Sequence, residues 1–94
     1  MENKKSASVT DRTQELKNKY SKLLHEMSTQ SQERKVLDYM IEHGSITQRE
    51  AAERLNCWRL AGRIHRLRSD NVEIITVLME NQGGGGNHAK YIIS

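Results

Sequence analysis

The sequence has few of the residues that mark several common classes of protein. Among its 94 residues there is no proline and no phenylalanine, and there is one tryptophan and one cysteine. A single cysteine excludes an internal disulfide framework and is typical of the reducing cytoplasm, where we expect the protein to act. Because only 35% of the residues are hydrophobic, any core must be small and mostly aliphatic.

Long hydrophobic runs and clustered reactive residues are also missing. No apolar stretch approaches the roughly 18 residues of a membrane-spanning helix, and the N-terminal MENKKSASVTDR lacks the apolar region of a secretory signal. The four histidines and Cys57 do not have the paired spacing of a zinc site, and no nucleophile, base and orienting acid cluster together. We therefore expect no membrane partner, no metal or other cofactor, and no enzymatic activity.

The positive charge is concentrated in one segment, although the formal net charge is only +3. Residues 54–68 contain five arginines and no aspartate or glutamate, so that segment carries +5 and the remainder −2. A local basic stripe suits a polyanionic partner. The alternative is a solvated amphipathic helix, but such a helix usually mixes charges of both signs in i,i+4 pairs. The pattern therefore favours nucleic acid as the partner.

The N-terminal third predicts a disordered segment over residues 1–9 and an amphipathic helix over 10–28, with Thr10 as its N-cap. Its apolar residues recur at helical spacing. This stripe either pairs two protomers or docks on the chain's own domain. The pairing alternative rests on heptad positions, but two heptads are marginal for an independent coiled coil. The residues concerned are Leu16, Tyr20, Leu23 and Met27.

Residues 29–94 predict one α+β domain. A helix over about 31–43 ends at Gly44, and a second begins with the capping box Thr47-Gln48-Arg49-Glu50 and ends at Asn56. A basic helix follows directly, with Cys57 and Trp58 at its start. Val72–Glu80 and Ala89–Ile93 are β-branched and apolar and are joined by a glycine-rich tip, which predicts a two-stranded hairpin.

The two helices on either side of Asn56 have the pattern of a helix-turn-helix. Ala51 and Ala52 give the first helix a small-residue face for close packing, and the second presents arginines outward. At about 100° per residue, Leu60, Ile64 and Leu67 fall on a buried face. The residues on or flanking the opposite face are Trp58, Arg59, Gly62, Arg63, His65, Arg66 and Arg68.

Two residues of the basic helix leave alternatives open. Gly62 lowers helix stability by about 1 kcal/mol relative to alanine. Its missing side chain either lets the backbone approach a ligand closely, or lets Trp58 one turn earlier lie flat, or relieves a contact with a neighbouring helix. Trp58 either stacks on a nucleotide or covers the edge of the core, and the structural role is favoured because a lone tryptophan in a small domain usually has one.

The run from Ser31 to Ser94 resembles the small helix-turn-helix domains of winged-helix type that many bacteriophages and prophages encode. The residues that carry the resemblance are GSITQREAAERL, WRLAGRIHRLRSDNVEII and the closing AKYIIS. The resemblance implies DNA binding, with the helix Trp58–Ser69 as recognition helix and the hairpin as wing. In the commonest repressor-type pattern a glycine stands where this chain has Asn56, and the turn here is one residue shorter, so repressor contacts cannot be transferred position by position.

Together these features predict a winged helix-turn-helix with an extra N-terminal helix, which binds double-stranded DNA as a small phage- or prophage-type regulator. It would act as a transcriptional repressor or a recombination- or excision-directing factor, associated with the nucleoid when bound and acting as a homodimer. The alternative is a protein-interaction module of the same fold, such as a phage-encoded inhibitor of a host enzyme or an assembly component. The predicted DNA-binding residues are Thr47, Gln48, Arg49, Trp58, Arg59, Gly62, Arg63, His65, Arg66, Arg68, His88 and Lys90.

Overall fold

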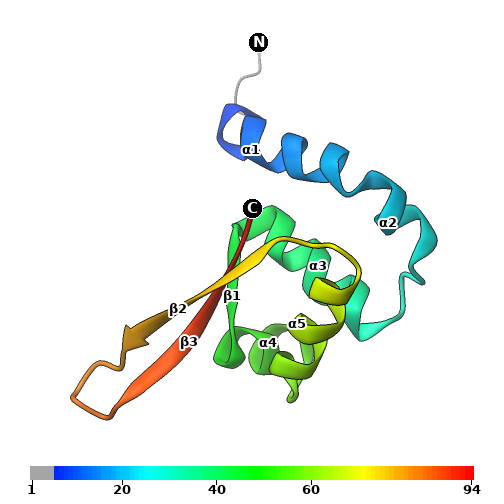
Figure 1. The fold of residues 1–94 in the computed structure, drawn as a ribbon. Coiled ribbons are helices and arrows are strands. Elements are labelled where there is room, and N and C mark those ends of the chain that lie inside the picture. Colours follow the sequence, from blue (N-terminus) through cyan, green and yellow to red (C-terminus); the bar gives the residue numbers. More distant parts are fainter. Residues whose placement is uncertain (1–5) are drawn as a thin grey trace.

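The computed structural model describes residues 6–94, with side chains from residue 12 onward. The described chain forms helices and a small antiparallel sheet, in agreement with the predicted α+β class (Figure 1). None of the described helices has the length and apolar character needed to span a membrane. The elements are α1 (Ser6–Lys19), α2 (Ser21–Glu26), α3 (Gln32–His43), β1 (Ser45–Thr47), α4 (Gln48–Leu55), α5 (Leu60–Ser69), β2 (Ile74–Glu80) and β3 (Asn87–Ile93).

The predicted helix boundaries around α3 and α4 are confirmed. Gly44 ends α3 in the left-handed conformation at φ 85°, which costs little without a Cβ. Thr47 and Glu50 form the expected capping box, in which each side chain accepts from the other residue's backbone amide. Asn56 ends α4 at φ 54°, a left-handed conformation that asparagine tolerates better than most residues.

The sheet has three strands rather than the predicted two. Its order is β1-β3-β2, and both pairings are antiparallel. β1 is only three residues long and pairs with β3 more than forty residues later, with Ile46 opposite Tyr91. Because so short a segment shows no alternation of its own, no sequence pattern indicates this strand. β1 anchors the hairpin to the start of α4.

A single aliphatic core joins the helices to the inner face of the sheet. Ile46 from β1, Ile74 from β2 and Ile93 from β3 all lie on that face and are buried. The remaining buried side chains come mainly from α3 and α5, with further ones from the N-terminal helices, α4 and the two segments that flank α5. They are Leu16, Tyr20, Val36, Leu37, Met40, Ile41, Ala51, Cys57, Leu60, Ile64, Leu67 and Val72.

The N-terminal region departs from its prediction in two ways. Residues 1–5 of the segment expected to be disordered lie outside the described residues, but residues 6–9 already belong to α1, so Thr10 is not its N-cap. The expected single helix is also divided at Tyr20 into α1 and α2. The two helices together, residues 6–26, are called the N-terminal arm below.

The arm docks on its own domain. Leu16 and Tyr20 are buried in the core, and Leu23 and Met27 pack against it. The Tyr20 hydroxyl donates to the Ser94 carbonyl at 2.8 Å and accepts from the Glu73 amide at 3.0 Å, which extends the end of the β2–β3 ladder. The side chains predicted to pair two protomers therefore pack against the core of their own chain. Of the two alternatives, the structure shows docking on the chain's own domain.

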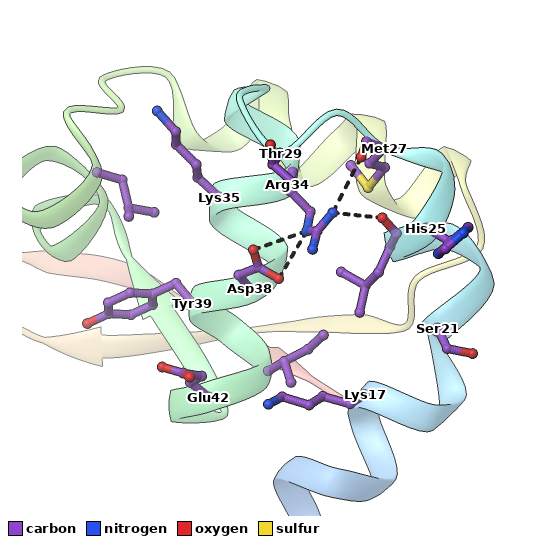
Figure 2. A pocket seen from close by; sticks show the side chains of 13 residues that line it. Lys17, Ser21, His25, Met27, Thr29, Arg34, Lys35, Asp38, Tyr39 and Glu42 are labelled. Carbon is purple, nitrogen blue, oxygen red and sulfur yellow. Dashed lines mark hydrogen bonds and ion pairs between the residues drawn. The ribbon is translucent and has the colours of Figure 1, made fainter.

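Arg34 fixes the second half of the arm to α3. Its guanidinium donates to the Leu24 carbonyl at 2.7 Å and the Met27 carbonyl at 3.3 Å, and it also binds the Asp38 carboxylate (Figure 2). Carbonyls at a helix C-terminus lack partners within the helix, so Arg34 satisfies the end of α2. A groove of about 880 Å³ remains between the arm and α3, with both positive and negative side chains in its lining.

Candidate nucleic-acid interface

The turn between α4 and α5 is longer than predicted. The backbone runs from Asn56 to Arg59 before α5 begins at Leu60. The prediction that the basic helix starts at Cys57 or Trp58 is therefore wrong. Cys57 is buried in the turn, and its amide donates to the Ala51 carbonyl at 2.9 Å.

Gln48 holds this turn through both ends of its side-chain amide. Its Nε2 donates to the Cys57 carbonyl at 3.1 Å, and its Oε1 accepts from the Leu60 amide at 3.1 Å. The second bond satisfies one of the free amides at the N-terminus of α5. Gln48 was predicted to contact DNA, but its hydrogen-bonding groups are used within the fold. Only the folded turn brings these atoms together, so no local sequence signal indicates the bond.

Trp58 lies in the turn and does not cover the core. Its side chain is 72% exposed, and its indole Nε1 donates to the Asn56 Oδ1 at 3.1 Å. The favoured structural role for this tryptophan is therefore wrong. Arg59 next to it is also exposed, and among residues 12–94 it has no acidic partner within ion-pair distance. The turn thus presents an aromatic ring and a free cation to solvent.

The buried and exposed faces of α5 are clearly separated. Leu60, Ile64 and Leu67 are buried, as predicted. The exposed side opposite them carries His65 and Arg66 among small residues. Two of these small residues, Ala61 and Ser69, were not among the predicted DNA-binding residues. A helix whose outward side chains are small can bring its backbone close to a ligand. We call this surface the recognition face; it consists of Ala61, Gly62, His65, Arg66 and Ser69.

Gly62 meets open space where its side chain would be. A Cβ built on this residue has no heavy atom of another element within 4 Å. The alternative that Gly62 relieves a contact with a neighbouring helix is therefore wrong. The described fold therefore gives no steric reason for the glycine, although glycine lowers helix stability relative to alanine.

Arg63 is paired with an acid that the sequence pattern did not reveal. Its Nη1 lies 2.7 Å from the Glu33 Oε2 of α3, and the Glu33 side chain is only 19% exposed. A hydrogen bond from its own backbone amide, and then the Arg63 guanidinium, hold the pKa of Glu33 below its ordinary value of 4.5. The expectation of an acid-free row of arginines is therefore wrong at this position.

Arg68 is also bound within the fold. Its Nε and Nη2 donate to the Ile74 carbonyl, and Nη2 donates to the Thr76 hydroxyl at 2.9 Å. This guanidinium links the end of α5 to β2. Arg68, which was predicted to contact DNA, therefore has a structural role in the fold. Arg66 differs, because it is 68% exposed and its nearest acid, Asp70, is 3.8 Å away. Such a loose exposed pair contributes little energy and is readily released.

The remaining predicted residues lie around the start of α4 and on the hairpin. Arg49 is exposed and forms an i,i+4 pair with Glu53 at 3.1 Å. Thr47 caps α4, and its strand partner Lys90 lies beside it in the centre of the sheet, away from the glycine-rich tip. His88 lies nearer the tip, where its Nδ1 contacts the Asn81 Oδ1. The structure therefore does not gather Thr47, His88 and Lys90 on the recognition face.

The family comparison agrees with this architecture. A family model described as a winged helix-turn-helix domain matches residues 31–94, which is well over half of the chain and begins just after the N-terminal arm. Comparisons with curated proteins and with solved structures found no match. Winged helix-turn-helix architecture indicates DNA as a partner. The chain therefore belongs to the winged helix-turn-helix domain family.

Proposed function

We propose that the protein is a sequence-specific regulator that inserts α5 into the major groove of duplex DNA. The observation that carries this proposal is the recognition face, where Gly62 has open space around it and His65 and Arg66 point outward from a helix-turn-helix. A B-DNA major groove about 12 Å wide admits a helix. The small residues on this face allow the backbone to approach the base edges.

The exposed cations divide into two roles. Arg66 is suited to bidentate hydrogen bonds with guanine, and His65 to a single hydrogen bond with a base or phosphate. Arg59 in the turn and Arg49 at the start of α4 are placed to contact phosphates, which fix the position of the protein but carry no sequence information. The hairpin then serves as a wing against the DNA backbone. Arg63 and Arg68 support the helix from its two sides.

The biological role follows from the resemblance of residues 31–94 to phage and prophage domains. We propose a small transcriptional repressor or a recombination-directing factor of that type, which acts in the cytoplasm without enzymatic activity. No cofactor is needed for this role, because recognition uses only side chains and backbone of α5, its turn and the wing.

The test is a titration of random-sequence and selected duplex DNA at two salt concentrations. Release of counterions by bound phosphates predicts a steep fall in affinity as salt rises. The double variant H65A/R66A should lose most binding without a change in melting temperature, whereas Lys22→Ala on the arm, which also removes one positive charge, should bind as wild type. Negligible affinity at low salt would instead favour a protein-interaction module of the same fold.

A further inference from the structure

The strand β2 is an edge of the sheet and carries little of the usual protection against pairing with another chain. The strand order β1-β3-β2 leaves one side of β2 without a neighbour, and the hairpin extends away from the helices (Figure 1). β2 pairs with β3 in unbroken register from Ile74 to Glu80 and contains no lysine, proline or bulge. Its one charged residue is Glu80, at its end. Natural edge strands normally carry lysine, proline or a bulge, which hinder pairing with another strand.

The backbone of β2 has free hydrogen-bonding groups along this edge. The Glu73 carbonyl accepts from the Ser94 amide, so at Glu73 the backbone groups face β3. Backbone groups alternate in direction along a strand, and those of residues 74, 76, 78 and 80 therefore face outward. Arg68 covers only the first of these carbonyls, at Ile74. Among the described residues, no group binds the outward amides and carbonyls of Thr76 and Leu78.

The side chains of β2 are unusually apolar for an exposed strand. Ile75 is 58% exposed, Leu78 70% and Met79 39%, and together they make up three of the four large exposed hydrophobic residues of the described chain. Ile75, Val77 and Met79 share the outer face of the sheet with Ile92 of β3. Leu78 lies on the opposite face of the strand, so the contiguous apolar row is that of Ile75, Val77 and Met79. An exposed apolar row of this kind is typical of an interaction site.

We propose that two copies of the chain associate through antiparallel pairing of their β2 strands, centred on Val77. In this register Val77 lies opposite the partner's Val77, Ile75 opposite the partner's Met79, and Thr76 opposite the partner's Leu78. Directly opposite side chains lie on the same face, so the outer apolar row continues across the junction. The outward backbone groups of Thr76 and Leu78 then pair with each other.

Charge complementarity selects this register over others. Centring on Val77 brings the partner's Glu80 opposite Ile74, next to the Arg68 guanidinium that binds the Ile74 carbonyl and Thr76 hydroxyl. The twofold axis makes the same Arg68–Glu80 pair twice. No like charges oppose each other in the paired segment. A shift of one residue would move the apolar side chains to opposite faces of the two strands.

Disulfide cross-linking tests the register. Opposed residues of a non-hydrogen-bonded antiparallel pair have Cα atoms about 4.5 Å apart, within the range that a disulfide bridges. Val77→Cys should therefore form a covalent dimer under mild oxidation. Ile75→Cys is the matched control, because its counterpart lies four residues along the partner strand, about 13 Å away. The native Cys57 is buried, so the wild type should not cross-link. Equal cross-linking of the two variants would overturn the register.

Sedimentation of the full chain without DNA tests the association itself. A failure of the proposed dimer is therefore distinguishable from a failure of DNA binding. The wild type should be dimeric at tens of micromolar. Val77→Lys places two like charges opposite each other and should raise the dissociation constant about tenfold or more. Glu80→Lys should weaken the dimer several-fold, whereas Glu26→Lys on α2, with the same charge change, should not.

Circular dichroism distinguishes a lost interface from a lost fold in each variant. Leu78→Pro provides a second block, since the Leu78 amide faces outward and its loss leaves the β2–β3 ladder intact. The wild type should be tested up to about 200 µM, roughly ten times the concentration at which we expect a dimer. A wild type that stays monomeric there would overturn the proposal. So would a dimer that Val77→Lys and Leu78→Pro leave unchanged.

Discussion

Arg66 and its neighbours Arg63 and Arg68 lie on the same helix and are identical in chemistry, yet the fold uses them differently. Arg63 binds Glu33 and Arg68 binds β2, whereas Arg66 is exposed with only a loose contact to Asp70. The first two flank the helix and stabilise its position, and the third belongs to the recognition face. The positive charge counted along α5 therefore exceeds the charge that is free to meet a ligand.

The strongest test of the recognition face is Gly62→Leu. The new side chain has open space within the chain, so the helix should become more stable by up to about 1 kcal/mol. The same side chain should keep α5 out of the groove and lower the affinity for duplex DNA about 100-fold, or about 2.7 kcal/mol. Melting curves and gel shifts measure the two effects.

Gly62→Ala provides the graded control for that substitution. A methyl group should raise the melting temperature at least as much as leucine, because alanine has the highest helix propensity. It should reduce binding far less, because it protrudes less. If leucine at this position leaves DNA affinity unchanged, the recognition face does not approach the bases.

Arg66→Ala should give the next largest effect and is the direct contrast with the flanking arginines. Loss of one bidentate base contact costs about 1–3 kcal/mol, so we expect about a tenfold or greater loss of affinity for the selected site. Stability should stay within about 0.5 kcal/mol of wild type, as for other exposed substitutions. Binding to the selected site and thermal unfolding are measured on the same preparation.

Arg68→Ala should show the reverse pattern. The substitution removes charge-assisted hydrogen bonds to the Ile74 carbonyl and Thr76 hydroxyl and should lower the free energy of unfolding by about 1 kcal/mol. The monomer's DNA affinity should change less than in Arg66→Ala. Urea unfolding provides the measurement, and undiminished stability would contradict a supporting role.

Glu33→Gln should give the smallest effect. Removing the carboxylate frees Arg63 and should raise affinity for DNA by about threefold, through Coulombic attraction near the surface. Because the pKa of Glu33 is lowered on folding, its contribution to stability is present above its ordinary pKa of 4.5 and is lost as pH falls through the lower folded value. The stability difference from Glu33→Gln should therefore shrink as pH falls below 4.5. A constant difference across that range would exclude the ion pair as its cause.

Local patterns predicted most of the fold because the relevant interactions are short in sequence. The capping box of Thr47 and Glu50, the left-handed Asn56 and the buried stripe of α5 each depend on residues within a few positions of one another. The hairpin was predicted from β-branched residues on either side of the glycine tip. These features together gave the winged helix-turn-helix architecture.

The predictions for the site were wrong where they depended on contacts between residues far apart in the sequence. Glu33 is thirty positions from Arg63, and Gln48 bonds atoms nine and twelve positions away. The exposure of Trp58 likewise depends on a turn whose length the sequence did not reveal. In each case a helical projection gives the direction of a side chain but not the group that meets it from another element.

By itself the sequence determined the order of α3, α4 and α5, the position of the wing and the inward face of α5, because periodicity and capping act over one or two turns. Only the tertiary structure decided which arginines are free, where the N-terminal arm docks and which strand edge stays open. Those outcomes depend on side chains brought together from distant segments, whose distances no local pattern encodes.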